Sequence, residues 1–332
     1  MNNRTITLLA LALAALTIAA CGGSGSGGGS GKLNLVAYST PKEAYEALIP
    51  AFDKTPEGKG VTFQQSYGPS GDQSRAVENG LGADIVAFSL EPDVKRLVDA
   101  GMVDANWSAG PTKGMVTDSV VVLAVRKGNP KGIKTFEDLA KPGVKVITPN
   151  PFTSGGARWN VMAIYGSQIV QGKTERQATE FLGSVFKNVE VQDKAARDAL
   201  QTFAGGKGDV LIAYENEAIQ AKQEGIELDY VIPDQTILIE NPIAVTKRAG
   251  DPEKAKAFVD FVQSPEGQRI FASKGYRPVD ESLVDEKRFP TPKQLFDITK
   301  FGGWDTVTDK FFDPSKGVMA KVEEDLGVST GG

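Results

Sequence analysis

The segment best suited to chemistry is the turn Asn150-Pro151-Phe152-Thr153-Ser154-Gly155-Gly156-Ala157-Arg158-Trp159-Asn160. A predicted strand, residues 144–148, leads into it, and a helical pattern follows from Arg158. Ser154 is a typical helix N-cap, so the N–H groups of Gly155 and Gly156 are among those with no partner inside the helix. Because glycine has no side chain to shield these groups, and because a helix dipole is positive at this end, the turn is suited to hold a small oxyanion.

Two other turns have a similar construction. Ser70-Gly71 opens a helix after the predicted strand 61–66, and Asp193-Lys194-Ala195-Ala196 opens another after 189–191, with Asp193 as the expected cap. In an open parallel sheet, ligands bind beyond the carboxyl ends of the strands, and all three turns follow strands. A small residue at one helix start is usually only a cap, so the prediction of an anion site depends on the three turns together.

Donor and acceptor chemistry narrows the identity of the anion. Sulfate accepts hydrogen bonds and donates none, whereas phosphate keeps a proton part of the time and is served by one carboxylate acceptor. A carboxylate facing a bare dianion in a desolvated pocket is strongly unfavourable. Asp72 is the one acid close enough to favour phosphate, but its place in the first turn of a helix favours an orientation toward solvent.

The charged residues near these turns have alternative interpretations. Arg158 either pairs with the anion or makes a supporting contact to Glu215 or to the loop, and Arg197 has the same two options. Glu215 and Glu217 are near enough in sequence for acid–base chemistry, but the chain has no histidine and one cysteine, Cys21. Histidine-based zinc sites, Ser-His-Asp triads and Cys-His dyads are therefore excluded, and we expect no metal and no cofactor.

Alternating strands and helices position these turns. The predicted strands are 33–38, 61–66, 84–88, 119–125, 144–148, 189–191, 209–213 and 236–245. The predicted helices are 42–52, 70–77, 92–100, 136–139, 158–170, 175–186, 195–203, one that opens at 214, 252–262 and 265–274. This order is typical of an α/β fold with a mostly parallel sheet and helices on both faces. The tail from Tyr276 is predicted to consist of turns rich in aromatic residues.

The length and charge limit the classes of protein. A chain of 332 residues is longer than a usual single core, which predicts two domains. The net charge of −5 and the lack of a basic stripe or an aromatic platform argue against nucleic acid as a partner. Net charge does not argue against a small-anion site, because buried donors act locally.

The N-terminal segment is predicted to be an export signal. Residues 1–21 contain an apolar run too short to span a membrane comfortably, which ends in Ile18-Ala19-Ala20-Cys21 and resembles the lipobox of bacterial lipoproteins. Cys21 is therefore predicted to carry more than one acyl chain, which is enough to anchor the protein stably to a membrane. Residues 22–32 are predicted to be a flexible Gly/Ser tether. The folded part is thus expected on the extracytoplasmic side of the cell membrane, periplasmic or at the cell surface.

The turn at 150–160 resembles the signature of the sulfate/thiosulfate-binding proteins of bacterial ABC importers. The resemblance extends from about residue 33 to about residue 312. Supporting matches are Ser70-Gly71, Asn188-Val189-Glu190-Val191, Ala196-Arg197, residues 208–213, 215–217 and 264–268, Tyr276-Arg277-Pro278 and residues 301–304.

That resemblance implies a two-lobed, type II periplasmic-binding-protein fold, with the ligand in the cleft and a membrane permease as the docking partner of the closed form. The first lobe is expected to comprise 33–118 and 244–332 and the second 119–243, with a hinge near Ser119 and Val245. The resemblance also implies ligation without charged side chains. The implied donors are the N–H groups of Ser70, Ala196, Gly155 and Gly156, the Ser154 hydroxyl and one aromatic side chain.

Two positions depart from the family pattern. The aromatic donor is usually a tryptophan, and here it is Tyr214, whose phenol can both donate and accept, which relaxes selectivity against protonated oxyanions. The family's Asp-Pro-Thr-Arg is here Ser39-Thr40-Pro41-Lys42, so Ser39 either supplies a hydroxyl or makes no contact. The expected function is delivery of sulfate or thiosulfate to an ABC importer by a lipid-anchored receptor. The alternatives are a receptor for phosphate, molybdate or another oxyanion, and an enzyme on the same fold.

Overall fold

The computed structural model describes residues 31–328. The predicted export signal, its Cys21 and nearly all of the tether lie outside the described residues. The strands are β1 (Lys32–Tyr38), β2 (Thr62–Gly68), β3 (Ile85–Ala87), β4 (Met115–Arg126), β5 (Val146–Pro149), β6 (Val189–Asp193), β7 (Val210–Tyr214), β8 (Leu228–Val231), β9 (Gln235–Val245) and β10 (Gln294–Phe296). The α-helices are α1 (Lys42–Phe52), α2 (Ser70–Glu78), α3 (Glu91–Asp99), α4 (Phe136–Leu139), α5 (Gly155–Val170), α6 (Glu175–Phe186), α7 (Ala196–Ala204), α8 (Glu215–Gln223), α9 (Pro252–Gln263), α10 (Pro265–Ser273), α11 (Gly303–Phe311) and α12 (Val318–Asp325).

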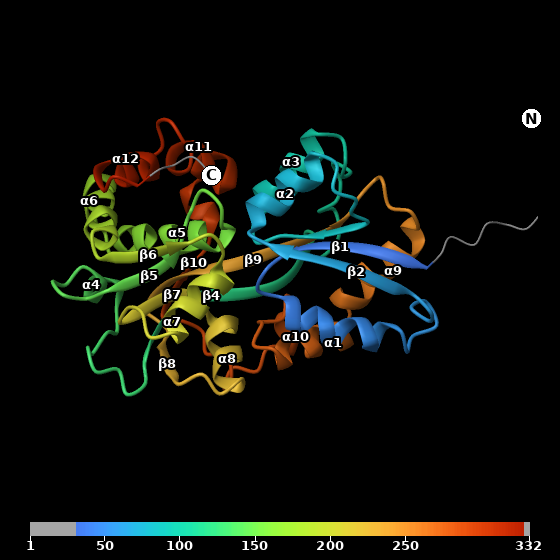
Figure 1. Cartoon of the computed structure of the whole chain (residues 1–332), viewed down its shortest axis with the longest axis horizontal. Coiled ribbons are helices and arrows are strands. Elements are labelled where there is room, and N and C mark those ends of the chain that lie inside the picture. The colour runs from blue at the N-terminus through green and yellow to red at the C-terminus, as the bar shows by residue number, and fades with distance from the viewer. Residues whose placement is uncertain (1–30, 329–332) are drawn as a thin grey trace, which may run out of the picture.

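The two long strands β4 and β9 join the halves of the molecule (Figure 1). The sheet order is β2-β1-β3-β9-β4-β7-β5-β6, with β10 beside β9 and β8 beside β4. The end of β9 pairs with β3, and its earlier part pairs antiparallel with the first part of β4. The last part of β4 pairs with β7. We call the β1-β2-β3 half the first lobe and the β5-β6-β7 half the second lobe.

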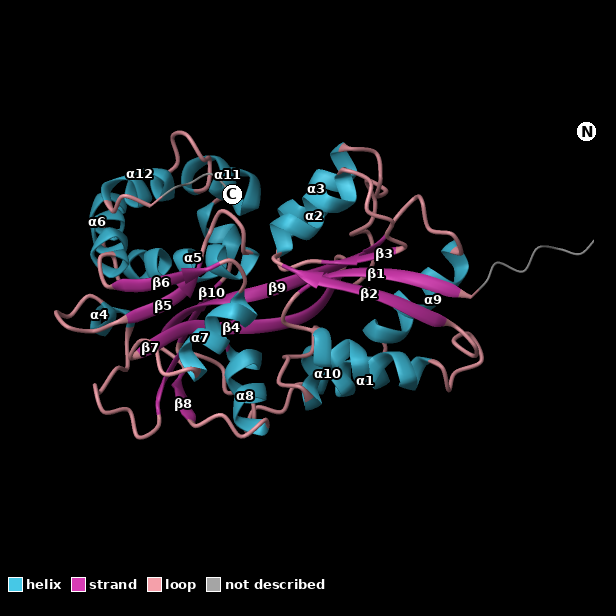
Figure 2. Cartoon of the chain, in the orientation of Figure 1, coloured by secondary structure: helices cyan, strands magenta, loops and turns pink. Residues whose placement is uncertain are grey.

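Each lobe has apolar side chains on both faces of its sheet, as the alternation of side chains along a strand requires. In β1, Leu33 and Leu35 pack in a cluster with α1, α9 and α10, whereas Val36 packs in another with α2 and α3. In β7, Ile212 packs in the cluster of α5 and α6, and Leu211 in that of α7 and α8. Figure 2 shows these helices on opposite sides of the strands. The predicted α/β class with helices on both faces is therefore confirmed.

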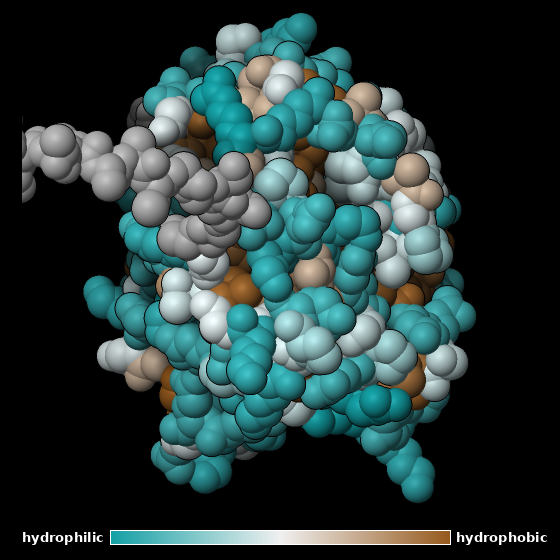
Figure 3. All heavy atoms as spheres, turned by 90° about the vertical axis from the view of Figure 1, so that its right-hand side faces the viewer, coloured by the Kyte–Doolittle hydropathy of each residue, from teal (hydrophilic) through white to brown (hydrophobic). Residues whose placement is uncertain are grey.

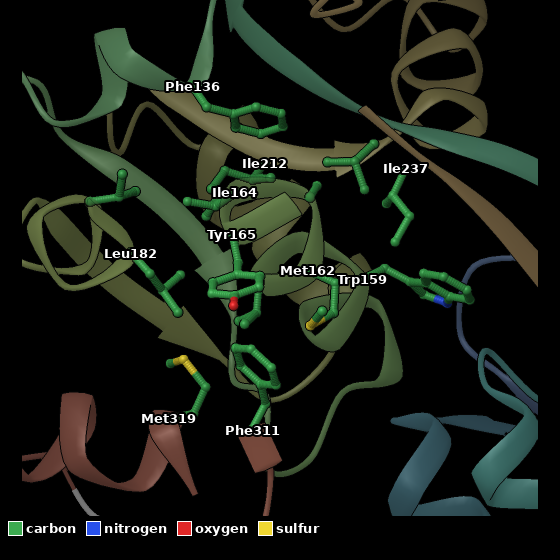
Figure 4. Close-up of a cluster of buried hydrophobic side chains, with 14 of the residues drawn as sticks. Phe136, Trp159, Met162, Ile164, Tyr165, Leu182, Ile212, Ile237, Phe311 and Met319 are labelled. Atoms are coloured by element: carbon green, nitrogen blue, oxygen red, sulfur yellow. The ribbon is translucent and has the colours of Figure 1, made fainter. Parts of the chain in front are cut away.

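The C-terminal tail differs from the prediction of turns alone, since it contains β10, α11 and α12. Most of the apolar side chains of these three elements pack in the cluster of α5 and α6 (Figure 4). Phe311, for example, lies edge-on to Tyr165 of α5, with ring centroids 4.7 Å apart. Trp304 lies edge-on to Trp159, also in α5, at 4.6 Å. This part of the tail therefore packs against the second lobe, whereas the expected first lobe comprised all of 244–332.

The surface at the first-lobe end is hydrophilic, with apolar residues in small separate patches (Figure 3). Among the described residues, Leu81 is the one large apolar side chain classed as exposed. None of the described helices combines the length and apolar character that a bilayer crossing requires.

Candidate anion-binding site

The turn at Ser154 is folded by its own polar groups. Asn150 Oδ1 accepts a hydrogen bond from the N–H of Phe152 at 2.8 Å, and the Asn150 carbonyl accepts from the N–H of Ser154 at 2.9 Å. Ser154 is the N-cap of α5, and its Oγ accepts from the N–H of Ala157 at 3.4 Å. The expected cap is therefore confirmed, and α5 begins three residues earlier than predicted, at Gly155. The N–H groups of Gly155 and Gly156, the first two residues of the helix, have no carbonyl partner inside it.

The start of α2 is held by buried side chains behind it. Ser70 Oγ donates to the carboxylate of Asp93 at 2.6 Å and accepts from the N–H of Ser89 at 3.0 Å. The hydroxyl of Ser70 is thus already engaged, so its backbone N–H is the group left at this helix start.

The third helix start differs in detail from the prediction. The N-cap of α7 is Ala195, and Asp193 is instead the last residue of β6, where its Oδ1 accepts from Thr202 Oγ1 at 3.1 Å. The prediction that Asp193 caps the helix was wrong because the chain stays extended for two residues longer. Thr153 Oγ1 donates to the Lys194 carbonyl at 2.8 Å, which fixes this turn beside the Ser154 turn.

The three helix starts surround one small cavity between the lobes. It is lined by Tyr38, Ser39, Thr40, Pro69, Ser70, Ser89, Ser154, Gly155, Gly156, Ala196 and Tyr214. Every residue predicted to contact the anion is in this set. None of these lining residues has a charged side chain. Asp72, the acid that would favour phosphate, pairs with Arg75 at 2.5 Å at a partly exposed position outside the lining, as predicted.

The three residues predicted to support the site lie outside the lining. Arg158 Nε donates to the Pro151 carbonyl at 2.9 Å, so it contacts the loop and not Glu215. Arg197 Nε donates to the Ser39 carbonyl at 3.2 Å, and the same guanidinium pairs with Glu43.

Glu215 is buried and forms a two-pronged ion pair with Arg277, with Nε to Oε2 at 2.6 Å and Nη2 to Oε1 at 3.1 Å. Burial raises the pKa of Glu215, although the hydrogen bond and the charge of Arg277 lower it in part. Sequence reasoning missed this role of Arg277, because the two residues are far apart in the chain.

Sequence reasoning also missed Ser89, which is buried and lines the cavity. Its Oγ lies 2.6 Å from Tyr214 Oη. Burial raises the pKa of Tyr214 well above its usual value, so this phenol stays protonated. The sequence did offer a signal for Ser89, which directly follows the predicted strand 84–88 and so lies at the same sheet edge as the three turns.

Glu217 lies just outside the cavity, in the first turn of α8. Its Oε2 accepts from the N–H of Tyr214 at 3.2 Å. Burial raises the pKa of Glu217 to about 7, although this hydrogen bond and the charge of Arg197 lower it in part. In the part of the chain that the structure covers, no three His, Cys, Asp or Glu residues are grouped in a way that could hold a metal ion.

Comparison with known proteins decides the family. A model described as bacterial extracellular solute-binding protein matches residues 33–277. The chain belongs to this family. This solute-binding protein is 45% identical over 292 residues to a sulfate-binding protein of Synechococcus elongatus, covering 85% of this chain and 83% of the relative. It is 35% identical over 294 residues to a thiosulfate-binding protein of Pseudomonas aeruginosa, covering 83% of this chain and 88% of the relative.

Among solved structures, the solute-binding protein resembles the sulfate-binding protein SubI from Mycobacterium tuberculosis H37Rv. The TM-score is 0.83 and the sequence identity 42%, covering 85% of this chain and 99% of SubI. This likeness confirms the two-lobed fold that the resemblance implied.

Proposed function

We propose that this solute-binding protein binds sulfate between its lobes and delivers it to an ABC importer. The observation that carries the proposal is the lining of the cavity, where three helix starts meet and every lining residue is uncharged. The names of the relatives at 45% and 42% identity support the same ligand.

A bare dianion suits these donors better than a protonated one. Backbone N–H groups only donate, and the positive ends of α2, α5 and α7 favour negative charge. No carboxylate lines the cavity to accept a hydrogen bond from the O–H of protonated phosphate, and Asp72 is paired at the surface. A lining with hydrogen-bond donors and no carboxylate acceptor favours sulfate over phosphate, a tetrahedral anion of similar size.

We assign the contacts to the groups left free at the cavity. The N–H groups of Ser70, Gly155, Gly156 and Ala196 and the hydroxyls of Ser154 and Tyr214 are proposed donors. Ser39 lines the cavity as well, and we propose that it also contacts the anion. Arg158, Arg197 and Glu215 are proposed to hold the surrounding elements in place and to leave the anion untouched.

Further parts of the proposal concern location and partner. Cys21 is proposed to carry the lipid that anchors the protein outside the cytoplasm, and the closed form is proposed to dock on the importer's permease. The protein is proposed not to be an enzyme, because Glu215 is paired with Arg277 and does not line the cavity. Strands β4 and β9 are proposed as the hinge, and the tail from β10 onward is proposed to move with the second lobe.

Calorimetric titration of the soluble domain with sulfate, thiosulfate, molybdate and phosphate tests the ligand. We expect sulfate to bind tightly and phosphate weakly. Thiosulfate, named for the Pseudomonas relative, is the second candidate. Tight phosphate or molybdate binding without heat or a thermal shift from sulfate would overturn the proposal.

A further inference from the structure

Ser89 is hydrogen-bonded to elements of both lobes around the cavity and to β9. It lies between β3 and α3 of the first lobe, where its N–H donates to Ser70 Oγ of α2 at 3.0 Å. Its carbonyl accepts from Trp159 Nε1 of the second lobe at 2.9 Å and from Asn241 Nδ2 of β9 at 3.1 Å. Its side-chain oxygen lies 2.6 Å from Tyr214 Oη, again in the second lobe.

The side chain of Ser89 also packs directly on the start of α5. A Cβ placed on Gly155 would lie 2.7 Å from Ser89 Cβ and 2.8 Å from its Oγ, both closer than real side chains allow. The Ser89 hydroxyl is therefore enclosed between Gly155 and Tyr214, with little freedom to point elsewhere.

Hydrogen counting assigns this hydroxyl a part in ligand binding. Ser89 and Tyr214 together have two O–H hydrogens, and one of them joins the two oxygens. One hydrogen remains, and both residues line the cavity. A chain of hydroxyls polarises its members, so the remaining O–H is a stronger donor than an isolated phenol.

We propose that Ser89 is a positioning residue for the anion: it forms one bonded unit with Tyr214 that supplies a donor hydrogen to the ligand and holds the two lobes together. The ligand part rests on the proposed function. The lobe-bridging part rests on the contacts of Ser89 alone.

A double-mutant cycle tests the unit, using Ser89→Ala, Tyr214→Phe and the double variant. We expect each single variant to weaken sulfate binding by about tenfold, equal to about 1.4 kcal/mol, through faster dissociation with little change in the association rate. Because the two hydroxyls act together, the sulfate affinity of the double variant should be no more than about threefold below that of the single variant that binds sulfate more weakly. Ser167→Ala is the matched control, since that buried hydroxyl donates only to the Ile164 carbonyl of its own helix.

A second measurement uses the protein without ligand. Each single variant should lower the Tm by about 2 °C, and the double variant by about the same amount rather than by the sum. Unchanged sulfate affinity in Ser89→Ala, or additive losses in the cycle, would overturn the inference. If the wild type bound none of the four oxyanions while the Tm losses stayed non-additive, the proposed function would fail, but the bond between the lobes would stand.

Discussion

At the scale of single residues, Gly155 is a position at the cavity where a side chain has no room. Its missing side chain lets Ser89 and Leu90 of the first lobe approach the start of α5. The backbone of Ser89 is held by three hydrogen bonds, so it has little room to retreat. Closure of the cleft therefore depends on the absence of a side chain at Gly155.

We predict that Gly155→Ala weakens sulfate binding by about tenfold or more, because overpacking of this kind costs about 1–3 kcal/mol in the closed form. The helix itself should tolerate alanine, so the Tm should not fall. Titration calorimetry and a thermal melt measure both quantities. Gly183→Ala is the control, since a Cβ there meets nothing within 4 Å. Wild-type affinity in Gly155→Ala would show that the lobes do not close as described.

Glu217 gives a prediction on pH. Burial raises its pKa to about 7 in the fold, against a usual value near 4.5. The folded protein then holds a proton that the unfolded chain releases between these two values. The stabilising contribution is present below about pH 4.5 and is lost as the pH rises through about 7.

We therefore predict that the free energy of unfolding of the wild type, relative to Glu217→Gln, falls by about 3 kcal/mol between about pH 5 and pH 8. The glutamine keeps an acceptor for the N–H of Tyr214 and does not titrate. Urea unfolding of both proteins at several pH values gives the difference. A difference that is constant with pH would contradict the assigned pKa.

At the scale of elements, sequence periodicity located all eight predicted strands within a few residues. The three helix starts were also found from the sequence, because small residues after a strand are a local signal. The short strands β8 and β10 were missed, as were α11 and α12. These pieces are brief, and distant partners hold them: β8 pairs with β4, β10 pairs with β9, and α11 and α12 pack in the cluster of α5 and α6. No local pattern in the sequence records such contacts.

The same limit explains which site residues were found. Ser154, Gly155 and Gly156 belong to one continuous motif. Ser89 and Arg277 act through partners 125 and 62 residues away, Tyr214 and Glu215, so their roles depend on the closed fold. Asp193 was misassigned as a cap because a strand end and a helix cap prefer similar extended backbone.

The packing of the tail gives a prediction at this scale. Phe311 is buried against Tyr165, in a cluster that also contains Leu182 and Met319 (Figure 4). We predict that Phe311→Ala destabilises the fold by about 3–5 kcal/mol, because it removes a buried aromatic ring. Hydrogen exchange should show faster exchange in α5 and α6 and little change in β1 and β2.

Phe52→Ala is the matched control for the tail. Phe52 is equally buried but belongs to the first lobe, where it packs edge-on with Phe258 at 5.2 Å. This variant should speed exchange in α1 and β1 instead. If Phe311→Ala affected the first lobe as strongly as the second, the tail would not move with the second lobe.

At the scale of the whole molecule, closure is held by contacts on several sides of the cavity. The N–H of Gly71 donates to the Thr153 carbonyl across the cleft at 3.3 Å, and Arg197 reaches Ser39 on another side. Strands β4 and β9 connect the lobes behind these contacts. The donors proposed for the anion thus come from both lobes, so tight binding and closure are expected to occur together.

The charge distribution yields the last prediction, since the protein carries a net charge of −5 and the cavity has no lysine or arginine in its lining. A site built on exposed cations loses affinity as salt screens the attraction. At the proposed site the attraction comes from buried dipoles at short range, which salt screens little, while the long-range repulsion between two negative partners is weakened by salt. We predict that raising sodium chloride from about 0.05 M to about 0.5 M changes the Kd for sulfate by less than about twofold and does not slow association. Stopped-flow kinetics with titration at each salt concentration measures both. A loss of affinity of tenfold or more would mean that arginine or lysine holds the anion, and the cavity of neutral donors would not be its binding site.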